Sequence, residues 1–166
     1  MTAQTAMQLA LAVPLAGAVG IALAGRWPNL RESVTLLTAL GLMASVWSLF
    51  PEIMAGGRPE WVLGEMMPGF TIAFRVEPLG MLFAALASLL WIVNSVYSIG
   101  YMRGNREGHQ TRFYVCFAIA LAATMGVAFA ENLLTLFLCY EVLTVSTYPL
   151  VSHKGDTATV RSARVY

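Results

Sequence analysis

Five long apolar stretches dominate this sequence and limit what it can fold into. A membrane-spanning helix needs about 20 mostly apolar residues. Stretches of this kind cover residues 6–24, 34–50, 79–101, 113–130 and 133–151. Of all residues, 58% are hydrophobic and 11% are charged, whereas soluble chains carry about 25% charged residues. We therefore predict a single all-α integral membrane domain with five transmembrane helices.

The first apolar stretch differs from a secretory signal peptide. A signal peptide begins with a positively charged region, but no Lys or Arg precedes Arg26 in this chain. We therefore expect residues 6–24 to be retained as the first transmembrane helix.

Several classes of chemistry find no support in the sequence. The net charge of +1 and the lack of a basic stripe argue against nucleic-acid binding. Cys116 and Cys139 lie in apolar runs, which is typical of small buried hydrophobic residues and not of a disulfide or metal site. There is no glycine-rich phosphate loop, CxxC motif or pair of histidines at metal-binding spacing. We expect this chain to bind no cofactor or metal and to have no catalytic chemistry of its own.

The basic residues predict an orientation in the membrane. Positively charged loops remain in the cytoplasm. With five spans, eight of the ten Lys and Arg residues share one side of the membrane: Arg26, Arg31, Arg103, Arg106, Arg112, Lys154, Arg161 and Arg164. Only Arg58 and Arg75 lie on the other side. This asymmetry predicts a multi-pass protein of the cytoplasmic (inner) membrane, with its N-terminus outside and its C-terminus in the cytoplasm.

The outer loop between the second and third apolar stretches contains a strand-like pattern. Residues 70–76 alternate aromatic or β-branched side chains with smaller or polar ones, which is typical of a half-buried strand. Residues 60–63 could pair with this segment across 64–69 and form a β-hairpin. The alternative is an irregular loop with Trp61 and Phe70 at the membrane interface, where aromatic residues collect.

The helix over 113–130 carries small residues four positions apart. The row consists of Ala118, Ala122, Gly126 and Ala130. Such a row allows a neighbouring helix to approach closely, so we consider these residues candidates for helix packing. The alternative is that Ala and Gly are simply common in membrane helices.

One acidic residue, Glu141, lies near the middle of the helix over 133–151. An ionised acid at a helix centre costs roughly 2.5–3.5 kcal/mol on insertion, and such acids usually mark ion or proton pathways. No other charged residue lies within the five spans as predicted. We therefore interpret Glu141 as an intramembrane proton-relay residue. The alternative is a structural acid that pairs with a polar group on a neighbouring helix.

A line of polar side chains leads from Glu141 toward the cytoplasmic end of its helix. Thr144, Tyr148 and Ser152 fall within about 60° of Glu141 around the helix axis, and His153 follows directly. Hydroxyl groups and a histidine could relay a proton along such a line. Hydroxyl groups, however, commonly bond their own helix backbone, and His153 with Lys154 is as well explained as a topology signal.

Sequence motifs in the second half of the chain resemble a known family. The run over 131–150, followed by His153-Lys154-Gly155, is similar to the fifth helix of antiporter-like proton-translocating membrane subunits. Residues 97–102 and 74–80 resemble the end of the third helix of that family and the segment leading into it. The family occurs in respiratory complex I, membrane-bound hydrogenases, formate hydrogenlyases and Mrp-type Na⁺/H⁺ antiporters. Residues 148–150 with 153–155 most resemble the D-type subunit of Mrp antiporters and its hydrogenase relatives.

The resemblance implies a role for Glu141 and a need for partners. Glu141 corresponds to the family's essential glutamate, which lies opposite a lysine of a later helix and helps to load protons. Family members have about fourteen helices, and the later helices with their lysines are missing here. We therefore expect a partial or split antiporter-like subunit of a multisubunit proton- or cation-translocating complex. Its expected partners are lipid and other membrane subunits, including a chain that supplies the missing helices.

Two alternatives to this function remain open. The chain could be a structural or assembly subunit of such a complex without a proton path of its own. It could also be a small carrier that functions as a homodimer, although the resemblance argues against this.

Overall fold

The computed structural model describes residues 2–152, and five of its helices are long and apolar enough to cross a membrane. These are α1 (Ala3–Leu23), α2 (Pro28–Trp47), α4 (Pro78–Gly104), α5 (Gln110–Ala128) and α6 (Leu133–Val151). Two short helical segments, η1 (Ala24–Arg26) and α3 (Phe50–Met54), extend α1 and α2. The predicted all-α membrane architecture therefore matches the described part of the chain.

Two helices are longer than their apolar stretches because they also include charged residues. α2 begins at Pro28, where proline suits the first helical position, and not near residue 34 as predicted. α4 continues to Gly104 and includes Arg103 in its last turn. The predicted bounds followed the apolar residues, whereas Arg31, Glu32 and Arg103 lie within the helices and form ion pairs.

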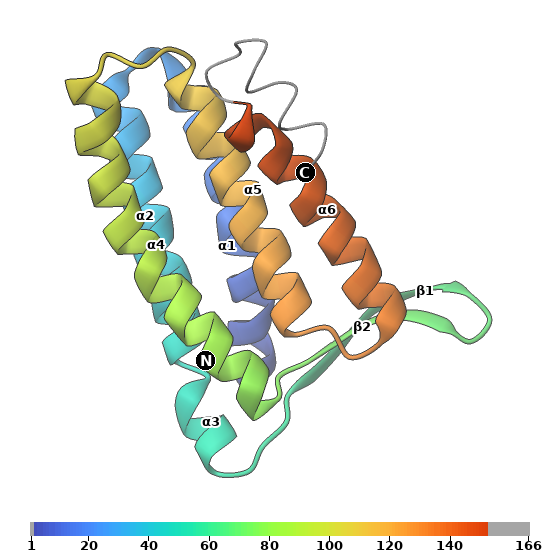
Figure 1. Ribbon diagram of the computed structural model, residues 1–166. Helices are drawn as coiled ribbons and strands as arrows, with labels where there is room; N and C mark the ends of the chain where they lie inside the picture. Colours follow the sequence, from blue (N-terminus) through green and yellow to red (C-terminus); the bar gives the residue numbers. More distant parts are fainter. Residues whose placement is uncertain (1, 153–166) are drawn as a thin grey trace.

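The helices form a bundle around α1 (Figure 1). α1 packs against α2 and α5, α2 also contacts α4, and α5 also contacts α4 and α6. Fully buried residues of these helices fill the centre, among them Met7, Ile21, Leu42, Trp91 and Met125, together with Phe129 just after α5. α6 lies at the outside of the bundle beside α5, and it also contacts strand β2.

An antiparallel pair of strands, β1 (Glu60–Met67) and β2 (Phe70–Arg75), lies between α3 and α4. Gly69 makes the turn between them with a φ of +85°, which glycine adopts without steric cost. Trp61 pairs with Phe74, and their rings stack with centroids 5.7 Å apart. These residues therefore form a small two-stranded sheet, which projects from one end of the bundle as a hairpin (Figure 1).

The segment between α5 and α6 pairs with the free edge of β2. α5 ends at Ala128, two residues earlier than predicted. Phe129 accepts a hydrogen bond from the backbone N–H of Arg75 (2.7 Å), and Ala130 forms an isolated bridge with Phe74. Placing Ala130 in the helical row was therefore wrong, because its backbone joins the sheet instead.

Candidate functional site

Glu141 lies near the middle of α6. It is an exposed residue beside a groove of about 450 Å³ between α5 and α6. The groove is lined by Glu141 together with Cys116, Ile119, Val142, Val145, Ser146 and Pro149. Within residues 2–152, no hydrogen bond or ion pair involves the Glu141 carboxylate.

α6 is the least covered of the five long helices. Only 11% of its apolar window is buried, against 28–39% for the other four. Large apolar side chains with more than half of their surface exposed lie on it, namely Leu133, Phe137, Tyr140 and Val145. Glu141 therefore belongs to a helix face that no part of the described chain covers.

The hydroxyl groups near Glu141 bond their own helix. Thr144 donates to the carbonyl of Tyr140 and Ser152 to the carbonyl of Tyr148, each at 3.0 Å. Tyr148 is 42% exposed, and His153 lies outside the described residues. A relay through Thr144, Tyr148 and His153 therefore stays a prediction. The hydroxyl groups of Thr144 and Ser152 donate to backbone carbonyl groups of α6.

Three of the four small residues predicted for helix packing lie on α5 and are buried: Ala118, Ala122 and Gly126. Gly126 meets both α6 and α1, because a Cβ atom added there would lie 2.6 Å from the Sγ atom of Cys139 and 3.9 Å from Leu11. The lack of a side chain at Gly126 therefore allows α6 to approach α5 closely.

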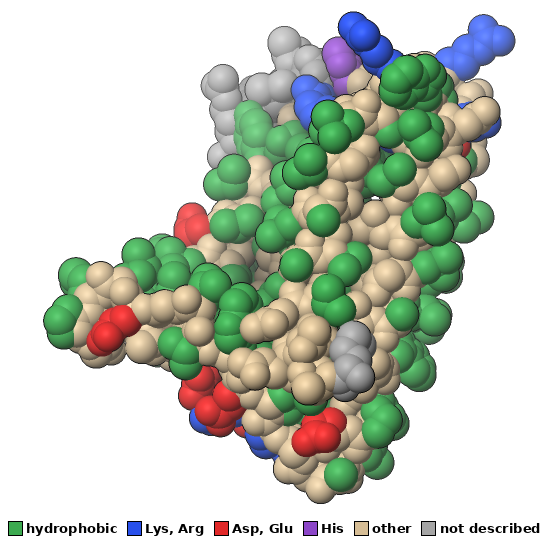
Figure 2. Space-filling view, turned by 180° about the vertical axis from the view of Figure 1, so that it is seen from behind, with side chains coloured by type: hydrophobic (Ala, Val, Ile, Leu, Met, Phe, Trp, Pro, Cys, Tyr) green, Lys and Arg blue, Asp and Glu red, His purple; other side chains and the backbone are tan. Residues whose placement is uncertain are grey.

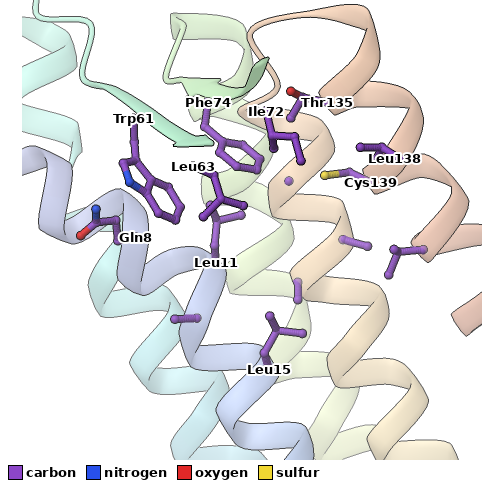
Figure 3. Close-up of a pocket in the computed structure, with 15 residues that line it drawn as sticks. Gln8, Leu11, Leu15, Trp61, Leu63, Ile72, Phe74, Thr135, Leu138 and Cys139 are labelled. Atoms are coloured by element: carbon purple, nitrogen blue, oxygen red, sulfur yellow. The ribbon is translucent and has the colours of Figure 1, made fainter. Parts of the chain in front are cut away.

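A second groove, of about 390 Å³, lies between α1, the hairpin, α5 and α6 (Figure 3). Side chains lining it include Leu11, Trp61, Phe74, Leu138 and Cys139. Val142 lines this groove and also the groove beside Glu141. The lining is almost entirely apolar, which suits lipid chains or apolar side chains and not polar chemistry.

A buried charged cluster that was not predicted from the sequence joins α2, α4 and α5. Arg31 and Glu32 of α2 are each only 5% exposed. Arg103 of α4 forms an ion pair with Glu32 at 2.6 Å. Arg31 lies 3.6 Å from Glu32 and donates to the Oε1 atom of Gln110 at 2.6 Å. Glu32 is therefore held between two guanidinium groups.

The ring of Tyr114 on α5 completes this cluster. The guanidinium carbon of Arg31 lies 5.3 Å from the centroid of this ring, within the range of a cation–π interaction. The hydroxyl group of Tyr114 is buried and has no hydrogen-bond partner in the described part of the chain. The sequence offered one signal for the cluster, since Arg31, Glu32 and Arg103 all lie beside the ends of apolar stretches.

A second, exposed set of charges holds the base of the hairpin. Arg75 pairs with Glu60 of β1 at 2.7 Å and with Glu131, just before α6, at 2.8 Å. The hydrogen bond with Glu60 raises the pKa of Arg75 above its ordinary value, and the charges of Glu131 and Glu60 act in the same direction. Arg75 therefore stays positively charged and links the hairpin to the start of α6.

Metal chemistry finds no support in the described residues, which contain no group of three His, Cys, Asp or Glu side chains that could hold a metal ion. The candidate site is therefore a single carboxylate on a membrane helix. A carboxylate at such a position can bind a proton or a cation.

Comparison with known proteins finds similarity to subunits of membrane complexes. No family model matches the chain. NADH-quinone oxidoreductase subunit N of Desulforudis audaxviator is 26% identical over 130 residues, which cover 78% of this chain and 26% of that protein. Na⁺/H⁺ antiporter subunit A1 of Staphylococcus aureus (strain bovine RF122 / ET3-1) is 32% identical over 121 residues, covering 72% of this chain and 14% of that protein.

A solved structure has the same fold. A chain of the membrane-bound sulfane sulfur reductase, an archaeal respiratory membrane complex, matches 86% of this chain with a TM-score of 0.71 and 19% sequence identity. The match covers 22% of that chain. The chain is therefore similar to membrane subunits of a NADH-quinone oxidoreductase and of a Na⁺/H⁺ antiporter. The predicted resemblance is thus confirmed at the level of the family, whereas the particular likeness to the D-type Mrp subunit stays a prediction.

The antiporter-like relatives are much longer than this chain. The matched region spans about a quarter of subunit N and about a seventh of antiporter subunit A1. Together with the five apolar helices, these matches support a multi-pass membrane protein.

Proposed function

We propose that this chain is part of an antiporter-like subunit in a multisubunit complex that moves protons or cations across the cytoplasmic membrane. In this proposal Glu141 is the group that binds the transported proton. One observation carries it: a carboxylate in the middle of a membrane helix has no partner among residues 2–152 and lies on an uncovered face.

The cost of burying charge supports an external partner for Glu141. Facing lipid, an ionised acid costs roughly 2.5–3.5 kcal/mol, and acids within membranes almost always face protein or a water-filled cavity. The uncovered face of α6 therefore requires further helices, on the same or another polypeptide. The relatives have this additional length, because the match covers only 14–26% of them.

The charges at the two ends of the bundle support the proposed orientation. The end with the α1–α2 and α4–α5 connections holds five arginines and two glutamates among the described residues, whereas the hairpin end holds two arginines and five glutamates. Figure 2 shows basic side chains gathered at one end and acidic ones toward the other. By the positive-inside rule, the hairpin and the N-terminus lie outside and α6 ends at the cytoplasmic side.

Replacing Glu141 by Gln in the intact complex tests the proposal. Proton-coupled transport is measured in membrane vesicles, and assembly is quantified in the same membranes. We expect transport to fall at least tenfold at normal assembly, because Gln has nearly the same shape but binds no proton. Glu52→Gln is the matched control, since Glu52 is exposed on α3 and has no ion pair among the described residues. Normal transport by Glu141→Gln would contradict the proposal.

A structural subunit is the second candidate, and the apolar character of the uncovered α6 face favours it. In that case Glu141 only pairs across an interface with a neighbouring subunit. Glu141→Gln would then reduce assembly, while transport per assembled complex would stay unchanged. Measuring assembly and transport together therefore separates the two candidates.

A further inference from the structure

The edge of β2 is joined by backbone hydrogen bonds to the segment that leads into α6. The N–H of Arg75 donates to the carbonyl of Phe129 at 2.7 Å, and the N–H of Glu131 donates to the carbonyl of Ala73 at 3.0 Å. The segment before α6 thus pairs with the free edge of β2. Because these bonds are directional, they fix the position at which α6 begins.

Side chains of the first turn of α6 continue this connection. The buried Oγ1 atom of Thr135 accepts a hydrogen bond from the N–H of Ala73 at 3.0 Å, and Thr135 is 0% exposed. Asn132 caps the helix by accepting from the N–H of Thr135 at 2.9 Å, and its Nδ2 atom donates to the carbonyl of Thr71 at 2.9 Å. Figure 3 shows Thr135 at the hairpin end of the groove, near Ile72 and Phe74 of β2.

Beyond its first turn, α6 is held in the bundle by its extensive packing against α5, and Gly126 brings the two helices close at Cys139. Van der Waals packing of this kind drives helix association in lipid, but it is less directional than hydrogen bonding. The polar contacts with β2 therefore add a directional restraint at the start of α6, which is the least buried of the long helices.

Glu141 lies six residues beyond Thr135 on the same helix. In an α-helix this separation corresponds to about 9 Å along the axis. Fixing Thr135 therefore fixes both the depth of Glu141 in the membrane and the direction in which its carboxylate points. Proton transfer depends strongly on such geometry, and a 1 Å misplacement can cost about 10²-fold in rate.

We propose that Thr135 is a positioning residue, which through its hydrogen bond with Ala73 of the hairpin sets the place of Glu141 for proton transfer. This inference rests on the proposed function of Glu141. Asn132 assists by orienting the same turn. The hairpin thus has a role inside the subunit, because it serves as the fixed point for the helix that carries the acid.

Thr135→Val tests the inference in the intact complex, because valine keeps the branched shape but removes the acceptor. We expect transport per assembled complex to fall about tenfold or more and the pH of half-maximal transport to shift. Thr135→Ser keeps the hydroxyl group and should restore both. Thr147→Val is the matched control on α6, since the hydroxyl group of Thr147 bonds only carbonyl groups of its own helix.

The wild-type rate and pH profile in assembled Thr135→Val would overturn the inference, and so would lower assembly with unchanged transport per complex. If Thr135→Val does not assemble, Asn132→Asp decides, because aspartate retains the helix cap but loses the donor to Thr71. A shifted pH profile in Asn132→Asp supports the inference, and an unchanged profile overturns it. Normal transport by Glu141→Gln would instead refute the proposed function itself.

Discussion

Two glutamates on membrane helices, Glu32 and Glu141, have opposite surroundings. Glu32 on α2 is 5% exposed and lies between Arg31 and Arg103. Glu141 on α6 is exposed and has no polar partner in the part of the chain that the structure describes. The chain thus compensates one negative charge internally and leaves the other for its surroundings.

Under the proposed function, this difference separates a structural charge from the acid that binds the transported proton. A buried ion pair that loses one partner leaves an uncompensated charge, which is strongly destabilising. An acid without an internal partner contributes little to the stability of its own chain, so a different requirement must explain its presence. The comparison therefore predicts that substitutions at the two glutamates affect different measurements.

The largest effect on stability is expected from Glu32→Ala. It leaves Arg31 buried beside another cation, and we expect a loss of about 3–5 kcal/mol in the free energy of unfolding. Thermal unfolding of the full chain in detergent measures this loss. In the same assay Glu141→Gln should lie within about 0.5 kcal/mol of the wild type, as surface substitutions do. A similar loss of stability in both variants would remove the distinction between them.

The next largest effect on stability is expected at the α5–α6 contact, which involves neither glutamate. In Gly126→Ala the added Cβ atom would lie 2.6 Å from the Sγ atom and 3.2 Å from the Cβ atom of Cys139. Such overpacking costs about 1–3 kcal/mol, so we expect a lower unfolding temperature. Gly100→Ala on α4 is the control, because nothing lies within 4 Å of its added Cβ atom. Equal unfolding temperatures for the two variants would argue against a close α5–α6 contact.

The comparison also explains what the sequence can predict. The five helices were predictable because a run of about 20 apolar residues has few alternatives in a membrane. The strands were predictable from the alternation over residues 70–76. The Glu32 cluster was not, because Arg103 lies 71 positions from Glu32 and only the packing of α2 against α4 brings them together.

Only the part of the candidate site that has a local sequence signal was predictable. The position of Glu141 within an apolar run identified it as unusual. The attachment of its helix to the hairpin could not be predicted, because the hydrogen bond from the N–H of Ala73 to Thr135 joins residues 62 positions apart. Thr135 itself is one of many hydroxyl residues in an apolar helix, and nothing in its local sequence distinguishes it.

A smaller effect is expected from Tyr114, whose ring and hydroxyl group have different roles. The ring supports Arg31 at 5.3 Å, but the buried hydroxyl group has no partner among the described residues. A buried polar group without a hydrogen bond costs about 1–3 kcal/mol. Tyr114→Phe should therefore raise the free energy of unfolding by about 1 kcal/mol, whereas Tyr114→Leu should lower it by loss of the cation–π interaction. If Tyr114→Phe proves destabilising, the hydroxyl group has a partner beyond residues 2–152.

The smallest effect is expected at the exposed ion pairs of the hairpin, which contrast with the buried cluster of Glu32. Surface pairs contribute little and are screened by salt, so Glu60→Gln should shift the unfolding midpoint by at most about 2 °C. The pKa of Arg75 is raised above its ordinary value, chiefly by its hydrogen bond with Glu60. The stabilisation linked to a raised pKa is complete at low pH and is lost only as the pH rises through that value. The contribution of Arg75 should therefore be constant from about pH 6 to about pH 9. If the difference between the wild type and Glu60→Gln changed within that range, another group would have to titrate beside Arg75.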